Sequence, residues 1–201
     1  RWALRCNPSS GNLHPTEGYL LLPPVAGIGE RAALYHYAPD DHALETRCVL
    51  PSGVAGEGDG FLVGLASIHW RETWKYGVRA YRYCQLDAGH ALASLGYAAA
   101  VLGWRLRMLA EPSDGELAEL LGLGREDRAR GGEQTFPVLL ARVETEAGEN
   151  APPWEIETLL PALAHGEWLG NPNRLGTGCK TWPAMAAVET AAIVTSMAPR
   201  S

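Results

Sequence analysis

Apolar runs of strand length recur along the first part of the chain and are separated by turn-forming residues. The run YLLLP at residues 19–23 is closed by proline, and FLVGLAS at residues 61–67 follows a glycine-rich loop. Short runs of this kind, bounded by glycine or proline, are typical of strands. We expect strands at residues 19–23, 32–37, 43–50, 61–67, 104–109 and 135–144.

Pro137 lies near the beginning of the last predicted strand. Proline cannot donate a backbone hydrogen bond to a neighbouring strand, so it is found mainly at sheet edges and at strand starts. Residues 135–144 are therefore expected to form either an edge strand or a strand that starts around this proline.

A helical stretch is expected directly after the strand at 61–67. Ser67 is a suitable N-cap for a helix that carries residues 69–85. Glu72 would lie in the early turns of this helix, where the helix dipole favours a negative charge. Gly77 lies inside the stretch and disfavours an unbroken helix.

Asp87 is expected to begin a second helix, at residues 87–103, which Gly103 would end. Leucine and alanine occupy most positions around this helix. A helix that is apolar on nearly all sides has no face suited to water, so we expect it to be buried in a core or in a subunit interface.

The remaining chain contains less regular patterns. Residues 113–124 have a cap, an amphipathic pattern and a glycine stop, which predicts a short helix, and residues 145–153 have the composition of a linker. Residues 154–194 are predicted to hold a weak helix and then an alanine-rich helix at 181–194. Strands and helices in this mixed order predict an α+β fold.

The charge and composition exclude several classes of protein. The net charge of −6 and the isoelectric point near 5.5 argue against nucleic acid as a partner, because phosphate binding needs a basic surface. No apolar run approaches the roughly 20 residues that span a bilayer, so we expect no membrane partner. The chain contains neither a GxGxxG motif after a strand nor a GxxxxGK[ST] motif, the two glycine-rich motifs that bind dinucleotides and nucleotide phosphates.

The cysteines are far apart and form no CxxC pair, which argues against a zinc site or a disulfide framework. Reduced, buried thiols in the cytoplasm are the favoured interpretation over a catalytic cysteine. His36 and His42 lack a third ligand at metal-binding spacing, so no metal site is expected. The four cysteines are Cys6, Cys48, Cys84 and Cys179.

Three longer segments carry a specific resemblance. NPSSGNLHPTEGYL, WKYGVRAYRYCQLDAGHALASLGYAAAVLGW and LAELLGLGRED resemble the SagB-type (ThcOx-like) branch of the FMN-dependent nitroreductase family, with matches from about Arg5 to about Val143. The resemblance implies a mixed sheet flanked by helices and an intertwined dimer with FMN at the subunit interface. It also implies two-electron (hydride) transfer, with small molecules or peptide azolines as substrates.

The resemblance also suggests which residues bind the flavin. The Pro-Ser-rich turn would lie beside the flavin ring, where Gly11 allows a close approach and the neighbouring side chains supply hydrogen bonds. The alternative is an ordinary surface turn. The cofactor-binding residues expected on this basis are Arg5, Pro8, Ser9, Ser10, Gly11, Asn12, Arg79, Arg82 and Ala110.

Lys75 and Tyr76 match the Lys-Tyr pair that azoline dehydrogenases of the family place near the reacting ring, and are the expected catalytic residues. The alternative is a solvated lysine and a core tyrosine. Consecutive helical residues point about 100° apart, so both reach one site only if the helix breaks near Gly77. We expect that break, with both side chains near residues 9–12 and Tyr76 nearer the flavin plane.

Arg79 and Arg82 lie one turn apart and would share a helix face. They suit a phosphate group, but they could equally pair with Asp87 or Glu72. For Asp87 and His90, a capped helix with a buried histidine is favoured over a functional role.

The resemblance gives an expected domain division of residues 1–144, a linker at 145–153 and a helical tail at 154–201. Family members take their main phosphate ligands from an Arg-Arg-Ser-like segment upstream of the turn, which would precede Arg1. The tail resembles the link to a second half in tandem members. We therefore expect a central piece of a tandem protein, either as an FMN enzyme or as a flavin-free structural half that pairs with an active one.

Overall fold

The computed structural model describes residues 5–54, 60–125, 134–145, 155–170 and 182–195. Within these ranges, seven strands form one sheet in the order β5-β6-β4-β1-β2-β3-β7. Every pairing is antiparallel, whereas a mixed sheet was expected. The strands are β1 (Thr16–Leu22), β2 (Ala33–Ala38), β3 (Ala43–Val49), β4 (Gly60–Ser67), β5 (Arg105–Leu109), β6 (Phe136–Glu144) and β7 (Glu167–Trp168).

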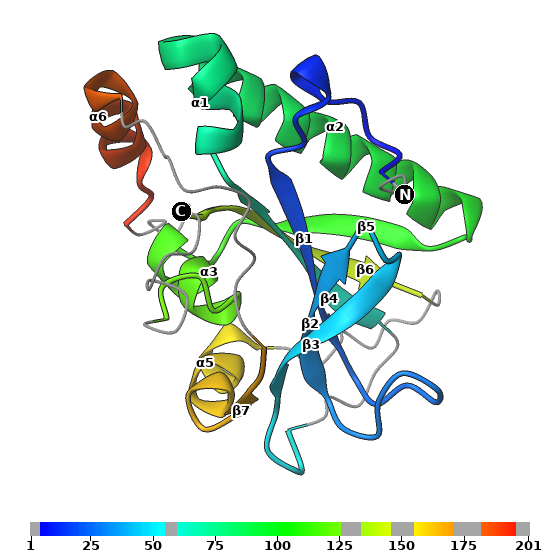
Figure 1. Ribbon diagram of the computed structural model, residues 1–201. Helices are drawn as coiled ribbons and strands as arrows, with labels where there is room; N and C mark the ends of the chain where they lie inside the picture. Colours follow the sequence, from blue (N-terminus) through cyan, green and yellow to red (C-terminus); the bar gives the residue numbers. More distant parts are fainter. Residues whose placement is uncertain (1–4, 55–59, 126–133, 146–154, 171–181, 196–201) are drawn as a thin grey trace, which may run out of the picture.

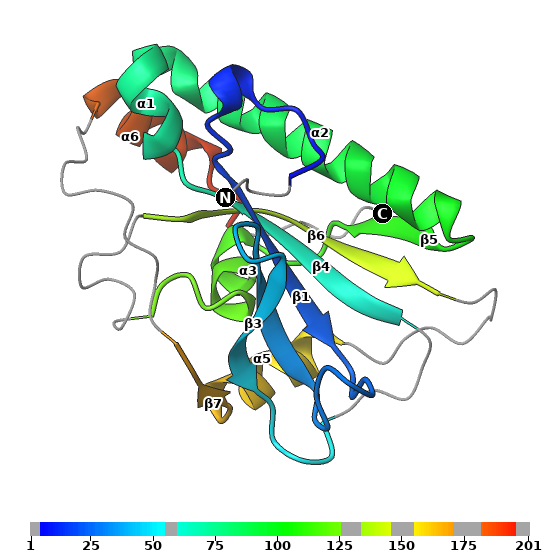
Figure 2. The same ribbon diagram turned by 45° about the vertical axis from the view of Figure 1, so that its right-hand side comes forward.

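Helices cover both faces of this sheet, which confirms the predicted α+β class with flanking helices. The long helix α2 crosses one face, and α3 and α5 pack on the other (Figures 1 and 2). The α-helices are α1 (Trp70–Tyr76), α2 (Ala80–Val101), α3 (Asp114–Leu120), α5 (Ile156–Ala164) and α6 (Pro183–Ala192), and the 3-10 helices are η1 (Ser10–Asn12) and η2 (Gly77–Arg79).

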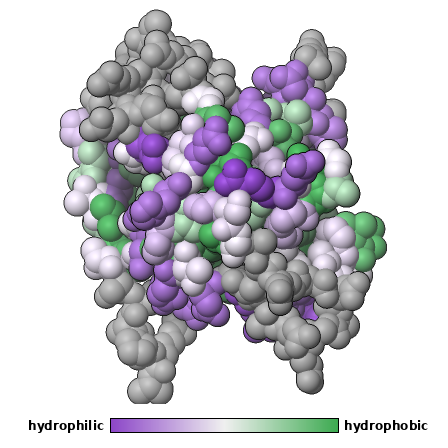
Figure 3. Space-filling view, turned by 90° about the horizontal axis from the view of Figure 1, so that it is seen from below, coloured by the Kyte–Doolittle hydropathy of each residue, from purple (hydrophilic) through white to green (hydrophobic). Residues whose placement is uncertain are grey.

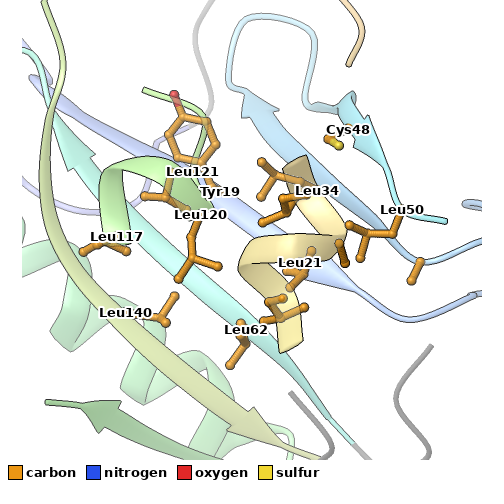
Figure 4. Packing of buried hydrophobic residues seen from close by; sticks show 14 of the residues in the cluster. Tyr19, Leu21, Leu34, Cys48, Leu50, Leu62, Leu117, Leu120, Leu121 and Leu140 are labelled. Atoms are coloured by element: carbon orange, nitrogen blue, oxygen red, sulfur yellow. The ribbon is translucent and has the colours of Figure 1, made fainter. Parts of the chain in front are cut away.

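The main hydrophobic core lies between the sheet and the helices α3 and α5. Leu21, Leu34 and Leu62 from the strands meet Leu117 and Leu120 from α3 (Figure 4). These side chains are at most 5% exposed. This packing fixes the sheet, and the sheet in turn fixes where β1 begins and β4 ends, next to α1.

The predicted break at Gly77 is confirmed. α1 ends at Tyr76, and Gly77 has φ 56° and ψ −134°, a conformation that residues with a Cβ rarely adopt. The predicted N-cap at Ser67 is wrong: Ser67 ends β4 between Thr16 and Phe136, its hydroxyl is buried, and His69 precedes the helix instead.

The predicted helix start at Asp87 is also wrong, because α2 runs unbroken from Ala80 to Val101. The Asp87 side chain points away from its own backbone and accepts hydrogen bonds from Ser9 and Ser10. A residue type that is common at helix starts is used here for a tertiary contact.

The six predicted strands are present with shifted ends, and the two-residue β7, which was not predicted, pairs with β3. Pro137 is the second residue of β6, opposite Ala66, so the strand-start interpretation is confirmed. The edge interpretation is wrong, because β6 lies between β4 and β5. Pairing with β5 begins only at Leu140, so no strand on that side requires an N–H group from Pro137.

The helix predicted at 113–124 is present as α3, which begins with a capping box and ends at Leu120. Ser113 Oγ accepts from the Glu116 N–H, and the Glu116 carboxylate accepts from the Ser113 N–H at 2.8 Å. α5 and α6 lie in the stretch that was predicted to be helical. Most of the predicted linker at 145–153 lies outside the described residues, so the division into domain, linker and tail stays a prediction.

The described residues contain no helix long and apolar enough to cross a membrane. They also contain no group of three metal-ligating side chains. Cys6, Cys48 and Cys84 are free thiols, and Cys179 lies outside the described residues. When the molecule of Figure 1 is viewed from below, the hydrophobic residues on its surface occur in small areas separated by hydrophilic ones (Figure 3).

Candidate functional site

The Pro-Ser-rich turn is attached to helix α2 by Asp87. Ser9 Oγ donates a hydrogen bond to Asp87 Oδ2 at 2.5 Å, and the Ser10 backbone N–H donates to Asp87 Oδ1 at 3.1 Å. Ser9 Oγ also accepts from the His14 N–H at 2.9 Å. Asp87 is only 1% exposed. The capped-helix interpretation of Asp87 is therefore wrong, and so is the buried histidine, because His90 is exposed.

Lys75 and Tyr76 converge on Gly11 in this turn. A Cβ atom added to Gly11 would lie 2.5 Å from Lys75 Nζ and 2.7 Å from Tyr76 Oη. Lys75 Nζ also lies 5.3 Å from the centre of the Tyr76 ring, and that ring packs against Tyr83 at 4.4 Å between centroids. The end of α1 at Gly77 thus brings two consecutive side chains to one place, as the sequence predicts.

Arg79 and Arg82 are exposed. Among the described residues, neither forms an ion pair with Glu72 or Asp87, so the predicted alternative of pairing is wrong. Both guanidinium groups are thus accessible to an anion from solution.

Arg5 and Asn12, which were also predicted to bind the cofactor, both contact His14. Arg5 donates from Nη1 to the carbonyl oxygens of His14 and Thr16, at 3.3 and 3.2 Å. Asn12 Oδ1 lies 2.9 Å from His14 Nε2, and Pro8 is exposed. Ala110 follows β5 and is exposed.

A buried ionic network that sequence reasoning missed lies beneath the turn. Glu17 in β1 accepts hydrogen bonds from Arg71 in α1 and from His36 in β2, the latter at 2.6 Å, and lies 3.9 Å from Arg5. His36 also contacts Glu45, at 2.9 Å. Burial alone would raise the pKa of Glu17, but the His36 hydrogen bond and the neighbouring cations hold it below its usual value. The sequence feature that could have revealed this network is Glu17 itself, an acidic residue on the buried side of an apolar strand.

A second missed contact joins the C-terminal helix to the start of α1. Glu189 in α6 contacts His69 Nδ1 at 2.7 Å, and the His69 ring stacks on Phe136 with 4.4 Å between centroids. Trp182 lies against Gly77: a Cβ on that glycine would be 3.5 Å from the indole ring. Residues of the tail therefore pack beside the helix break.

A cavity of about 360 Å³ lies between α2 and the sheet, apart from the turn. Arg5, Thr16 and Glu17 are among its lining residues, and most of the lining is apolar. Lys75, Tyr76 and residues 8–12 are not among its lining residues. The cavity and the Lys75–Tyr76 cluster are thus two separate features.

Comparison with known proteins identifies the fold. No family model matches the chain, and none of the curated proteins matches it. A protein of Anabaena variabilis assigned as a nitroreductase has a TM-score of 0.56 at 21% identity, covering 83% of this chain and 38% of its own.

Two further solved structures give a similar result. The microcin synthetase complex McbBCD of E. coli, solved with truncated pro-MccB17 bound, has a TM-score of 0.54 at 20% identity over 71% of this chain and 56% of its own. A Ralstonia eutropha protein assigned as a nitroreductase has a TM-score of 0.53 at 19% identity over 71% and 63%. The chain thus has a nitroreductase-like fold and spans less than two thirds of each of these proteins.

Proposed function

We propose that this chain is an oxidoreductase domain of the nitroreductase type that binds FMN beside the Pro8–Asn12 turn. The observation that carries the proposal is the convergence of Lys75 and Tyr76 on Gly11. When bound, FMN would supply two-electron chemistry by accepting or donating a hydride. We further propose the SagB type, because Lys-Tyr-Gly stands where α1 ends.

The described residues fit a flavin phosphate and ring in two respects. Arg79 and Arg82 are exposed and without ion pairs among the described residues, so they can bind a phosphate group. Gly11 has no Cβ, and Lys75 and Tyr76 can move away from it as the flexible ends of long side chains. The turn itself is fixed in place by Asp87.

Lys75 and Tyr76 would handle the proton of the reaction. Oxidation of an azoline requires removal of a proton from carbon, and a tyrosine phenolate, or a lysine that has given up its ammonium proton, can accept it when correctly placed. Nζ and Oη both lie over Gly11, so either can face a substrate bound at the turn. A peptide azoline or a small molecule is the proposed substrate, and the free thiols suit the cytoplasm.

Titration with FMN tests this proposal. We expect the protein to quench FMN fluorescence, and Lys75→Ala and Tyr76→Phe to bind FMN nearly as tightly as the unchanged protein. Both variants should slow reduction of the flavin at least tenfold, because they remove a proton acceptor but no phosphate ligand. Stopped-flow absorbance measures this step. A protein that stays colourless and gains no thermal stability with FMN would contradict the proposal.

A flavin-free structural half of a larger assembly is the second candidate. It is favoured by the bonds that already occupy the turn: Ser9 and Ser10 bind Asp87, and Asn12 contacts His14. In that case the turn would have a structural role only. FMN would then cause no quenching at any concentration, although the protein would still associate with a second nitroreductase-like half.

We also propose that the outer face of α2 is a dimer interface. Leu86, Tyr97 and Val101 are exposed on this helix, with 77% of Tyr97 and 86% of Val101 accessible. Neighbouring apolar residues on one helix are usually covered by a partner. A second copy of this chain is the expected partner, as in the dimers of the family that the sequence resembles.

The double variant Tyr97→Glu/Val101→Glu is expected to be monomeric, because it would place charges within the apolar contact. Sedimentation velocity at micromolar concentration measures the change. Ile28→Glu is the matched control: Ile28 is 48% exposed in the loop between β1 and β2, and its replacement should leave the dimer intact. Sedimentation of the protein without substitutions as a monomer would contradict the proposed dimer.

A further inference from the structure

Glu72 is a buried acidic residue that takes no part in the proposed chemistry. It lies in α1 and is 0% exposed, and neither of its carboxyl oxygens has a hydrogen-bond partner among the described residues. Asp87 in α2 is almost equally buried, but its oxygens accept hydrogen bonds from Ser9 and Ser10. The protein therefore provides donors for a negative charge at Asp87 and none at Glu72.

The charge of Glu72 changes close to neutral pH. Burial, followed by the charge of Asp87, raises the pKa of Glu72 to about 7, although the charge of Lys75 opposes this shift. A carboxylate without donors is poorly accommodated in a protein interior, so the neutral acid is favoured below that pH. Above it, two negative charges lie beside each other between α1 and α2.

Lys75 connects this carboxyl group to the turn. It follows Glu72 by one helical turn, so the two residues lie on the same side of α1. Its ammonium group reaches the space over Gly11. When Glu72 is neutral, the Lys75 ammonium group stays over the turn. When Glu72 is a carboxylate, it attracts the ammonium group away from the turn and toward itself.

We propose that Glu72 is a positioning residue for Lys75: by gaining or losing a proton, its carboxyl group sets how closely the Lys75 ammonium group approaches Gly11. The importance of this position for catalysis rests on the proposed function. The electrostatic coupling itself requires no flavin. It makes the geometry of the Lys75–Tyr76 cluster depend on pH.

The groups that face Glu72 come from two helices, with one polar neighbour from the sheet. Lys75 lies on α1, and Asp87 and Cys84 lie on α2. Ser67, at the end of β4, contacts Cys84. Burial raises the pKa of the Cys84 thiol to about 12, so Cys84 adds no charge near neutral pH. Asp87 supplies the negative charge that a Glu72 carboxylate would meet.

The lysine content of the chain allows a direct test. Lys75 and Lys180 are its two lysines. Reductive methylation with ¹³C-formaldehyde gives each lysine its own NMR signal, and Lys75→Arg identifies the signal of Lys75. In the flavin-free chain, we expect the Lys75 signal to shift with an inflection near pH 7, at the midpoint of Glu72.

Two variants and one control complete the test. Glu72→Gln should remove the inflection, and Asp87→Asn should move it to lower pH, because a neighbouring negative charge is lost. Glu119→Gln, at an exposed position in α3, should leave it unchanged. A Lys75 signal without an inflection between about pH 5 and about pH 9, or an inflection that persists in Glu72→Gln, would overturn the proposal. Failure of FMN to bind would affect the proposed function and not this result.

Discussion

Glu17→Gln is expected to lower the free energy of unfolding by about 3–5 kcal/mol, the usual cost of removing one partner from a buried ion pair. Glu17 is 6% exposed, and both Arg71 and His36 direct nitrogen atoms at its carboxylate. Glutamine keeps the shape of the side chain but not the charge. Arg71, only 8% exposed, would then lose the charged hydrogen bond that it makes to Glu17. Urea denaturation measures the loss.

Glu45→Gln is the matched control, because Glu45 contacts the other nitrogen of His36 but its side chain is 49% exposed. An exposed partner contributes little, so we expect a change of less than about 1 kcal/mol. Equal effects of the two variants would contradict the assigned importance of Glu17.

The effect of Glu17 also depends on pH. Its pKa is lower in the folded protein than its usual value of 4.5. The stability that it contributes is therefore fully present above that usual value and is lost as pH falls through the folded pKa. The difference between the unchanged protein and Glu17→Gln should accordingly be larger at neutral pH than in acid.

Gly11→Ala is expected to weaken FMN binding at least tenfold, or about 1.4 kcal/mol. The new methyl group would fill the space that Gly11 leaves open for close approach of the flavin, and Lys75 Nζ and Tyr76 Oη, at 2.5 and 2.7 Å, would have to move as well. The backbone of Gly11, with φ 63°, also disfavours alanine, at a cost of about 1 kcal/mol in stability. Fluorescence titration with FMN and thermal unfolding measure the two effects separately.

Gly27→Ala separates the backbone effect from the contact. Gly27 has φ 83°, and no atom lies within 4 Å of the position of its missing Cβ. It should lose similar stability and bind FMN as the unchanged protein does. Equal loss of FMN binding in both variants would mean that close approach of the flavin to Gly11 has no role.

The fold class and the helix break at Gly77 could be predicted from sequence because their causes are local. Apolar runs between turn residues mark strands, and two consecutive side chains can reach one site only if a helix ends beside them. The position of Ser67 could not be predicted this way. Its side chain type suits a helix start, but the pairing of β4 with β1 and β6 keeps it in the sheet.

The partners within the site could not be predicted because they are distant in sequence. Ser9 binds Asp87 at a separation of 78 residues, and Arg71 binds Glu17 at a separation of 54. Neither pair has a spacing that a local pattern reveals. Arg79 ends η2 and Arg82 lies in α2, and only the structure excludes their pairing with Glu72 or Asp87.

The place of β6 between β4 and β5 has a consequence for biosynthesis. β1, β2 and β3 are neighbours in sequence and in the sheet, so they can form a meander soon after they leave the ribosome. β4 and β5 can pair on their inner edges only after β6, at Phe136–Glu144, has been made. Until then the nascent chain has an unpaired strand edge with which other chains can pair. We therefore expect the nascent chain to be most prone to aggregation between the synthesis of Ser67 and that of Glu144.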